Sequence, residues 1–200
     1  MKKRGLLLVL SGPSGAGKGT VCRALLKNEP SLRLSVSATT RPPRPGEVDN
    51  VDYFFLDSEI FNKMIKDGEF LEYAQVYNNY YGTPQPFVEE SLKEGHDIIL
   101  EIDIQGALQV KEKYPEAVLI FIAPPSKFDL KKRLFSRGAD AWEVIEKRLR
   151  CASDEMKLAD RYDYIVVNDQ VIRAVERIRS IIIAEKSRPH NFKRLLNSFN

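Results

Sequence analysis

The segment from Leu6 to Thr20 reads Leu-Leu-Leu-Val-Leu-Ser-Gly-Pro-Ser-Gly-Ala-Gly-Lys-Gly-Thr. Its first five residues form a continuous apolar run, which is typical of a parallel strand that is covered on both faces. The glycine-rich stretch beginning at Gly12 follows, and a helix is predicted from about Lys18 to Asn28. A strand, a glycine-rich loop and a helix in this order predict an α/β fold with a phosphate-binding loop.

The loop has the spacing Gly12, four residues, Gly17-Lys18. Glycines let backbone N–H groups turn inward around a polyphosphate, and the start of the helix adds its unpaired donors. A plain glycine-rich turn is the alternative interpretation. The hydroxyl stands at Thr20 and not directly after the lysine, so the metal is expected to be held mainly by phosphates and water. Nucleotide binding is predicted for Gly12, Pro13, Ser14, Gly15, Ala16, Gly17, Lys18, Gly19 and Thr20.

Apolar runs and helical patterns alternate along the rest of the chain, which predicts a parallel sheet with helices on both faces. The further strands are predicted at residues 97–102, 117–122 and 164–167. The helices are predicted at residues 106–113, 127–136, 142–160 and 171–186.

Residues 34–86 interrupt this rhythm with many prolines, glycines and tyrosines. We interpret the interruption as short strands and turns inserted into the core. The expected organisation is one α/β core made of residues 1–33 and 88–200, with a small inserted domain at residues 34–87.

Charge and cysteine content narrow the functional classes. The formal net charge is +3, and residues 186–200 alone carry +4, so the rest of the chain sums to −1. A basic face for nucleic acid is therefore not expected. Two cysteines favour a reducing compartment. The apolar run after Met1-Lys2-Lys3-Arg4 is too short for a signal peptide, and no stretch is long enough to span a membrane. We expect a cytoplasmic protein.

Several later motifs resemble the guanylate kinase family in the family's own order, over about residues 5–184. The resemblance is carried by residues 35–47 (Ser-Val-Ser-Ala-Thr-Thr-Arg-Pro-Pro-Arg-Pro-Gly-Glu), Asp52-Tyr53, residues 70–73 (Phe-Leu-Glu-Tyr), residues 81–83 (Tyr-Gly-Thr), residues 100–106 (Leu-Glu-Ile-Asp-Ile-Gln-Gly), residues 133–137 and Arg148.

The resemblance implies phosphorylation of GMP by ATP with Mg²⁺, and also of dGMP. It makes the insertion a GMP-binding domain and residues 133–150 a short lid. Guanidinium groups match phosphate oxygens, so the arginines of the insertion would clamp the GMP phosphate together with two tyrosine hydroxyls. The implied GMP contacts outside the base pocket are Ser37, Arg41, Arg44, Tyr53 and Tyr81.

For the base, the resemblance implies that Glu72 accepts from guanine N1–H and the amino group, that Asp103 reinforces this recognition and that Thr83 bonds the base. Carboxylates suit guanine because adenine offers an acceptor at N1. Each residue has a simpler alternative: Glu72 could pair with a lysine, and Asp103 could cap the helix near residue 106.

The family's catalytic cations correspond to Lys18, Arg133, Arg137 and Arg148, which would neutralise charge on the transferring phosphoryl group. Asn168 would lie near the adenine of ATP. Glu101 would lie near the Mg²⁺–phosphate region, and the direct protein ligands of the metal stay open.

Three other functions are possible. A non-catalytic guanylate-kinase-like module would bind protein partners, but such modules have degraded ATP sites. A kinase for another monophosphate would differ in the base pocket. Binding of RNA or membrane by the basic tail is the weakest option, and the oligomeric state is left open.

Overall fold

The computed structural model describes residues 4–76, 78–136, 142–192 and 197–198, without the side chains of residues 136, 142–144 and 190. Its larger sheet has five parallel strands in the order β2-β7-β1-β8-β9. These strands are β1 (Leu7–Ser11), β2 (Leu32–Leu34), β7 (Asp97–Glu101), β8 (Val118–Ala123) and β9 (Tyr164–Val167).

Helices cover both faces of this sheet. Side chains alternate along a strand, so β1 sends Leu7 and Val9 into one apolar cluster and Leu8 and Leu10 into the other. The first cluster lies under α3 and α4, and the second lies under α1 and α7. The helices are α1 (Lys18–Asn28), α3 (Gln85–Glu94), α4 (Ile104–Lys113) and α7 (Val171–Lys186). The predicted α/β fold with a parallel sheet and helices on both faces is confirmed.

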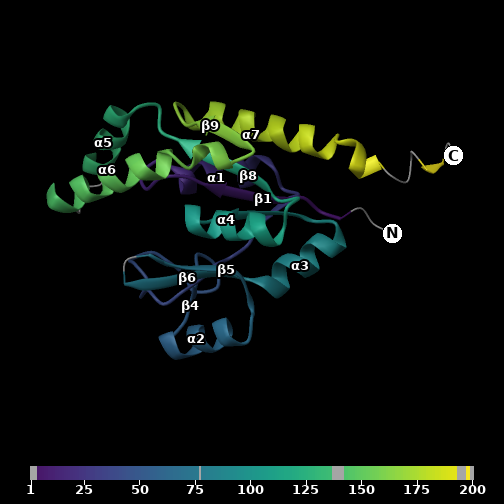
Figure 1. The fold of residues 1–200 in the computed structure, drawn as a ribbon, viewed down its shortest axis with the longest axis horizontal. Helices are drawn as coiled ribbons and strands as arrows, with labels where there is room; N and C mark the ends of the chain where they lie inside the picture. Colours follow the sequence, from purple (N-terminus) through teal and green to yellow (C-terminus); the bar gives the residue numbers. More distant parts are fainter. Residues whose placement is uncertain (1–3, 77, 137–141, 193–196, 199–200) are drawn as a thin grey trace.

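A second sheet is built by residues between β2 and α3. Its four strands have the order β4-β3-β6-β5, and α2 covers it with Phe61 stacked on Phe70 at a ring distance of 4.5 Å. Figure 1 shows α4 between the two sheets. The elements are β3 (Ala38–Thr39), β4 (Phe54–Phe55), α2 (Ser58–Lys66), β5 (Phe70–Val76) and β6 (Asn79–Pro84).

Helices α5 (Lys127–Ser136) and α6 (Trp142–Met156) lie together at one end of the molecule (Figure 1). They have a small apolar cluster of their own, made of Leu130, Leu134, Ile145 and Ala152.

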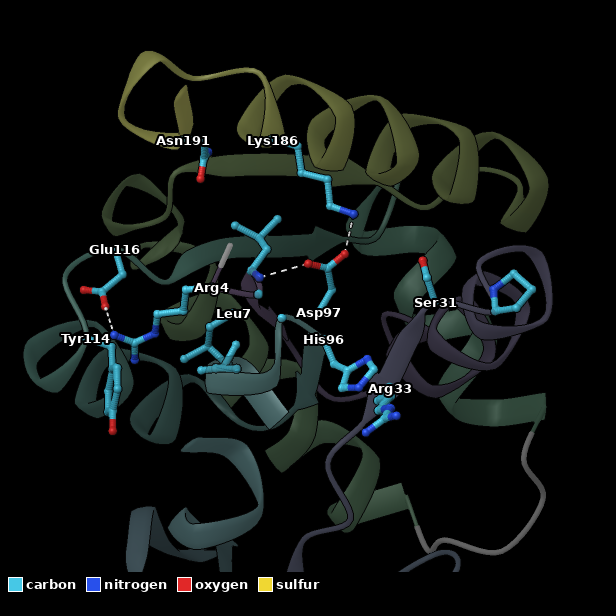
Figure 2. Close-up of a pocket in the computed structure, with 15 residues that line it drawn as sticks. Arg4, Leu7, Ser31, Arg33, His96, Asp97, Tyr114, Glu116, Lys186 and Asn191 are labelled. Atoms are coloured by element: carbon cyan, nitrogen blue, oxygen red, sulfur yellow. Dashed lines mark hydrogen bonds and ion pairs between the residues drawn. The ribbon is translucent and has the colours of Figure 1, made fainter. Parts of the chain in front are cut away.

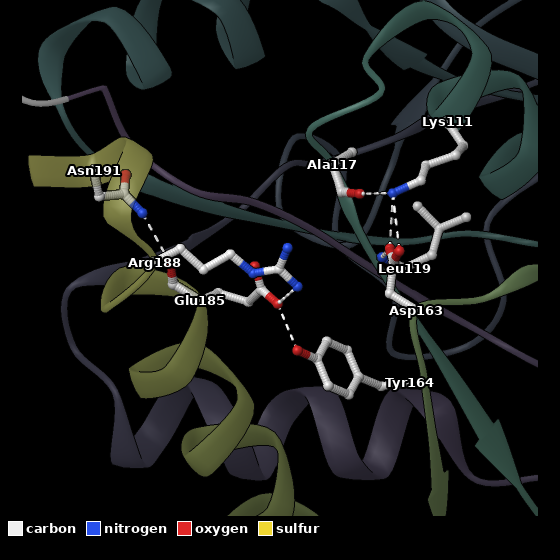
Figure 3. A network of polar contacts seen from close by, with 8 residues as sticks. All are labelled: Lys111, Ala117, Leu119, Asp163, Tyr164, Glu185, Arg188 and Asn191. Carbon is white, nitrogen blue, oxygen red and sulfur yellow. Dashed lines mark hydrogen bonds and ion pairs between the residues drawn. The ribbon is translucent and has the colours of Figure 1, made fainter. Parts of the chain in front are cut away.

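Polar contacts fix strand β9 and helix α7 (Figure 3). Lys111 donates to both carboxylate oxygens of Asp163, and the backbone N–H of Leu119 donates to the same carboxylate at 2.8 Å. The Tyr164 hydroxyl donates to Glu185 on α7. These bonds hold β9 against α4 on one side and α7 on the other.

The structure differs from the predicted elements in several places. Helices α2 and α3 were not predicted, and neither was β2. The density of prolines predicts turns up to Pro86, but Pro86 stands in the first turn of α3, where its missing N–H costs nothing. The predicted helix 142–160 ends at Met156. Helix α4 begins at Ile104, two residues early, because Asp103 caps it.

The expected domain limits fall within elements: β2 lies across residue 33, and α3 lies across residue 87. Among the described residues, no helix combines the length and the apolar composition that crossing a membrane requires.

Candidate functional site

The glycine-rich loop closes around the Lys18 ammonium. Lys18 stands at the first position of α1, and its Nζ donates to the carbonyl oxygens of Gly12 at 2.6 Å and Pro13 at 3.3 Å. Gly17 has a φ of 93°, a left-handed conformation that favours glycine. The loop therefore places a cation and the N-terminus of a helix at one point, which is suited to a bound phosphate.

Asn168 and Arg133 hold the outer side of this loop. Asn168 follows β9, is buried, and donates through Nδ2 to the carbonyl oxygen of Ala16 at 2.8 Å. Arg133 on α5 donates to the same oxygen at 3.1 Å and to the Asn168 carbonyl at 2.7 Å. Both predicted residues are thus brought to the loop. Arg133 therefore joins helix α5 to the loop and to the residue that follows β9.

A cavity of about 200 Å³ lies between the loop and the second sheet. It combines residues that are distant in sequence: the ammonium-bearing Lys18, the carboxyl end of β7, and the β5–β6 hairpin. Six predicted residues and Glu101 line it. They are Lys18, Ser37, Tyr53, Glu72, Tyr81, Glu101 and Asp103.

Glu72 is the buried carboxyl group of this cavity, with 3% of its surface exposed. Its Oε1 accepts from the Thr83 hydroxyl at 2.7 Å. Burial raises the pKa of Glu72 to about 7, the charge of Asp103 adds to this effect, and the bond from Thr83 opposes it. Near neutral pH this carboxyl group therefore holds a proton in part of the molecules.

Asp103 is both a cavity residue and a helix cap. Its Oδ1 accepts from the backbone N–H of Gly106 at 2.8 Å and so starts α4. The alternative interpretation of Asp103 as a cap is therefore correct for one of its oxygens. The cap fixes the side chain at the cavity wall, at the carboxyl edge of the parallel sheet.

The arginines and tyrosines of the insertion form a second group. Arg41 pairs with Glu47 at 2.9 Å, and its guanidinium lies 5.6 Å from the centre of the Tyr53 ring. Tyr53 and Tyr81 meet edge to face at 6.0 Å. Burial alone would lower the pKa of Arg41, but hydrogen bonds with Glu47 and Tyr81 raise it, so the guanidinium stays charged. The exposed Arg44 joins this group through its backbone N–H, which donates to Glu47 at 2.7 Å.

Glu101 ends β7 and lies beside Gly19, opposite Lys18. Burial raises its pKa, while the charges of Lys18 and Arg23 lower it. Glu101 therefore adds a carboxyl group beside the glycine-rich loop. The described residues contain no group of three or more histidine, cysteine, aspartate or glutamate side chains arranged to hold a metal.

The arginines predicted to belong to a lid are only partly described. Arg148 is half-buried on α6, and Arg137 lies outside the described residues. Sequence reasoning missed Glu155 on the same helix and Glu47 in the insertion. The pKa of Glu155 is raised by burial and lowered by Lys18 and by the backbone N–H of Ser14, so this carboxyl group also faces the loop. Helical spacing alone gives no signal for Glu155, and Glu47 lies in a segment of turns without periodicity.

A larger cavity of about 710 Å³ lies at the amino ends of strands β1 and β7, at the other end of the parallel sheet from the loop (Figure 2). None of the predicted site residues lines it. Its buried carboxylate, Asp97, accepts from the backbone N–H of Leu6 at 2.9 Å and pairs with Lys186, while Arg4 pairs with Glu116 at 3.6 Å. These charged groups are bonded to one another and tie the chain near its two ends to the core. We therefore assign the functional site to the smaller cavity, which the predicted residues line.

Comparison with known proteins agrees with this geometry. A family model described as guanylate kinase matches residues 4–185. The chain is 58% identical over 188 residues to a guanylate kinase of Caldanaerobacter subterraneus subsp. tengcongensis, covering 94% of this chain and 91% of that relative. It is 52% identical to a guanylate kinase of Clostridioides difficile over 97% and 95% of the two chains. The crystal structure of guanylate kinase from Anaplasma phagocytophilum superimposes with a TM-score of 0.82 at 35% identity, covering 99% of this chain and 96% of that one.

Proposed function

The chain belongs to the guanylate kinase family, and from that premise we propose that it transfers the γ-phosphoryl group of ATP to GMP, giving ADP and GDP. The supporting observation is the single cavity that joins Lys18 of the phosphate loop to Glu72 and Asp103. A loop for a polyphosphate and a pocket with two carboxyl groups then face one another across the space that the transferred group must cross. We extend the proposal to dGMP as acceptor.

The division of labour follows the two sheets. The core of residues 1–33 and 88–200 binds ATP, and the insertion of residues 34–87 binds GMP. Residues 133–150 act as a lid. In the core, the loop from Gly12 to Thr20 wraps the ATP phosphates with its backbone N–H groups, and Asn168 lies at the adenine side.

The acceptor phosphate is bound by the group around Arg41. Arg41 and Arg44 offer planar guanidinium donors, and the hydroxyls of Tyr53 and Tyr81 complete the set, with Ser37 on the same wall. Glu47 is paired to Arg41 and bonded to the backbone of Arg44, so it orients both arginines before GMP arrives.

The acceptor base is read by the carboxyl groups. Guanine presents two donors, N1–H and the 2-amino group, on the edge that Glu72 and Asp103 face. Thr83 orients Glu72 through its hydroxyl and contacts the base. Adenine would leave the buried carboxylate opposite an acceptor, and an unsatisfied buried charge is costly.

Transfer itself is a matter of position and charge. Lys18 and the lid arginines Arg133, Arg137 and Arg148 place positive charge around the phosphoryl group as it moves in line between the two nucleotides. Closure of the lid excludes water, which would otherwise compete with the GMP phosphate as the attacking group.

The residues present fit a magnesium ion that is held mainly by phosphates and water. The half-buried Glu101 carboxylate at the loop is an acidic group in position to hold its water ligands. When bound, Mg²⁺ neutralises phosphate charge. We place the reaction in the cytoplasm and in purine nucleotide metabolism.

A coupled assay of ADP formation tests the proposal, with ATP and Mg²⁺ fixed and GMP, dGMP, AMP, UMP and dTMP supplied in turn. Turnover with GMP and dGMP, and little with the others, is the expected result. Turnover with another base would overturn the roles of Glu72 and Asp103. No turnover with any acceptor, from protein shown to be folded, would favour the non-catalytic protein-binding module.

A further inference from the structure

Helix α4 meets strand β5 through one face. Gly106, Gln109 and Lys113 are spaced three and four residues apart, so they line one side of the helix. Strand β5 is the edge strand of the second sheet, and it carries Glu72. Figure 1 shows the two elements side by side, at the junction of core and insertion.

Gln109 and Lys113 bond to the free edge of β5. Gln109 donates to the Tyr73 carbonyl at 2.9 Å and accepts from the Tyr73 N–H at 3.3 Å, as a neighbouring strand would. Lys113 donates to the carbonyl oxygens of Phe70 at 3.3 Å and Leu71 at 2.6 Å. The backbone on both sides of Glu72 is therefore tied to α4.

Gly106 gives the Glu72 side chain its space. A Cβ at this position would overlap Glu72 Oε2 and would come within 2.9 Å of its Cδ. The backbone N–H of Gly106 also donates to Oδ1 of Asp103. Glycine is unfavourable within helices relative to alanine. The backbone of Gly106 is not in the left-handed region, so the glycine is needed here for the carboxylate and not for the chain.

We propose that the face of α4 made of Gly106, Gln109 and Lys113 positions Glu72 and Asp103 relative to each other and thereby sets the choice of acceptor base. The inference rests on the proposed function and extends it to residues that do not touch the substrate. Gly106 fixes how deep the Glu72 carboxylate lies, and the other two fix the strand that carries it.

The sharpest readout is the preference for GMP over IMP. Hypoxanthine keeps the N1–H donor of guanine but lacks the 2-amino group. A carboxylate at the correct depth accepts from both donors of guanine, and a displaced one accepts from a single donor. A shift of Glu72 should therefore reduce turnover of GMP more than turnover of IMP, so that the preference for GMP over IMP decreases.

A double-mutant cycle tests the proposal. Gly106→Ala should raise the KM for GMP at least about tenfold and leave the KM for ATP within about twofold. Glu72→Asp retracts the carboxylate by one methylene and makes room for the new Cβ. In that background, Gly106→Ala should change the KM for GMP by less than about threefold, since the two positions are coupled. Glu112→Ala, on an exposed position of α4, is the matched control and should change neither KM.

Thermal melting separates this effect from loss of structure, because alanine alone should not lower the melting temperature of a helix. If Gly106→Ala does lower it, Gln109→Leu carries the same test and should raise the KM for GMP about threefold with the KM for ATP unchanged. Equal costs of Gly106→Ala in both backgrounds, or an unchanged preference for GMP over IMP, would overturn the inference. Absence of GMP turnover in the unmodified protein would instead overturn the proposed function.

Discussion

The Thr83 hydroxyl donates at 2.7 Å to Oε1 of Glu72, which lines the cavity, and both residues are buried. This bond favours the ionised carboxylate, but burial outweighs it and holds the pKa of Glu72 at about 7. The residue that we propose to read the acceptor base is thus partly protonated near pH 7. Guanine presents two donors to this carboxyl group, N1–H and the 2-amino group, so binding of guanine must remove the proton from Glu72.

GMP affinity should therefore rise with pH. With a pKa of about 7, the dissociation constant for GMP at pH 6 should be about tenfold that at pH 8, because only ionised Glu72 accepts from both donors. Calorimetry at both pH values measures this. The GMP phosphate also titrates, so Glu72→Gln is the control: its affinity should be weaker and should lose the part of the pH dependence that Glu72 causes. An identical pH profile in the two proteins would contradict the assignment.

The same group affects folding with the opposite dependence on pH. The native state keeps the proton of Glu72 above the pH at which the unfolded chain loses it, so its contribution to stability decreases as pH rises from about 4.5 to about 7. Glu72→Gln should flatten the melting temperature across this range. A steeper decrease in the variant would be inconsistent with a raised pKa.

Lys18→Met should abolish most of the activity without unfolding the protein. The ammonium is the loop's only side-chain cation within the described residues, and loss of a preorganised donor to the transferring phosphoryl group lowers kcat about 100-fold or more. Steady-state kinetics and melting curves check both parts. Lys27→Met, near the other end of α1, should behave like the unmodified protein. Near-normal kcat in Lys18→Met would contradict the role of the loop.

Asn168→Ala should weaken ATP and spare GMP. The hydrogen bond from the Asn168 side-chain amide to the Ala16 carbonyl holds the loop in place. Its loss should raise the dissociation constant for ATP about tenfold. The dissociation constant for GMP, measured by calorimetry, should stay within about twofold. Asn28→Ala is the control, because it removes a similar hydrogen bond from a side-chain amide to a backbone carbonyl on the exposed face of α1. An equal loss for both nucleotides would point to general destabilisation.

Glu47→Gln should act on the acceptor alone. It weakens the ion pair with Arg41 and the bond to the Arg44 backbone, so the KM for GMP should rise about three- to tenfold, as expected for a charge-assisted pair. The KM for ATP should not change. Glu59→Gln on α2 is the control. A raised KM for ATP would show that Glu47 does not act through the arginines.

Much of the fold follows from periodicity and punctuation in the sequence. Helices α1, α5 and α7 and strand β9 have the predicted limits, because apolar spacing and start signals agree at these elements. The two missed helices lie where proline, glycine and tyrosine are dense. Asp57 and Pro84 precede them. The apolar face of α2 becomes clear only against the second sheet, and that of α3 only against the parallel sheet. The three-residue β2 is too short for any pattern.

The site could be predicted in part for a similar reason. The phosphate loop is contiguous, so its chemistry can be read from the order of residues. The acceptor residues were placed by resemblance to a family, and the structure brings Ser37, Tyr53, Glu72, Tyr81 and Asp103 to one cavity. The contacts of Gly106 and Glu155 join elements that are distant in the chain, and neither composition nor spacing records such distances. Glu47 bonds to Arg41 and Arg44 within one turn-rich segment, where no periodicity marks the partners.

The ratio of kcat/KM for GMP to kcat/KM for AMP, with saturating ATP and Mg²⁺, tests the central claim most directly. The buried carboxyl group of Glu72 and the half-buried one of Asp103, matched to guanine donors, should favour GMP by about 10⁴-fold. Glu72→Gln should reduce this ratio by at least about tenfold while the KM for ATP stays constant. A ratio near one in the unmodified protein would contradict the account, because the cavity that joins Lys18 to Glu72 and Asp103 would then not select the base.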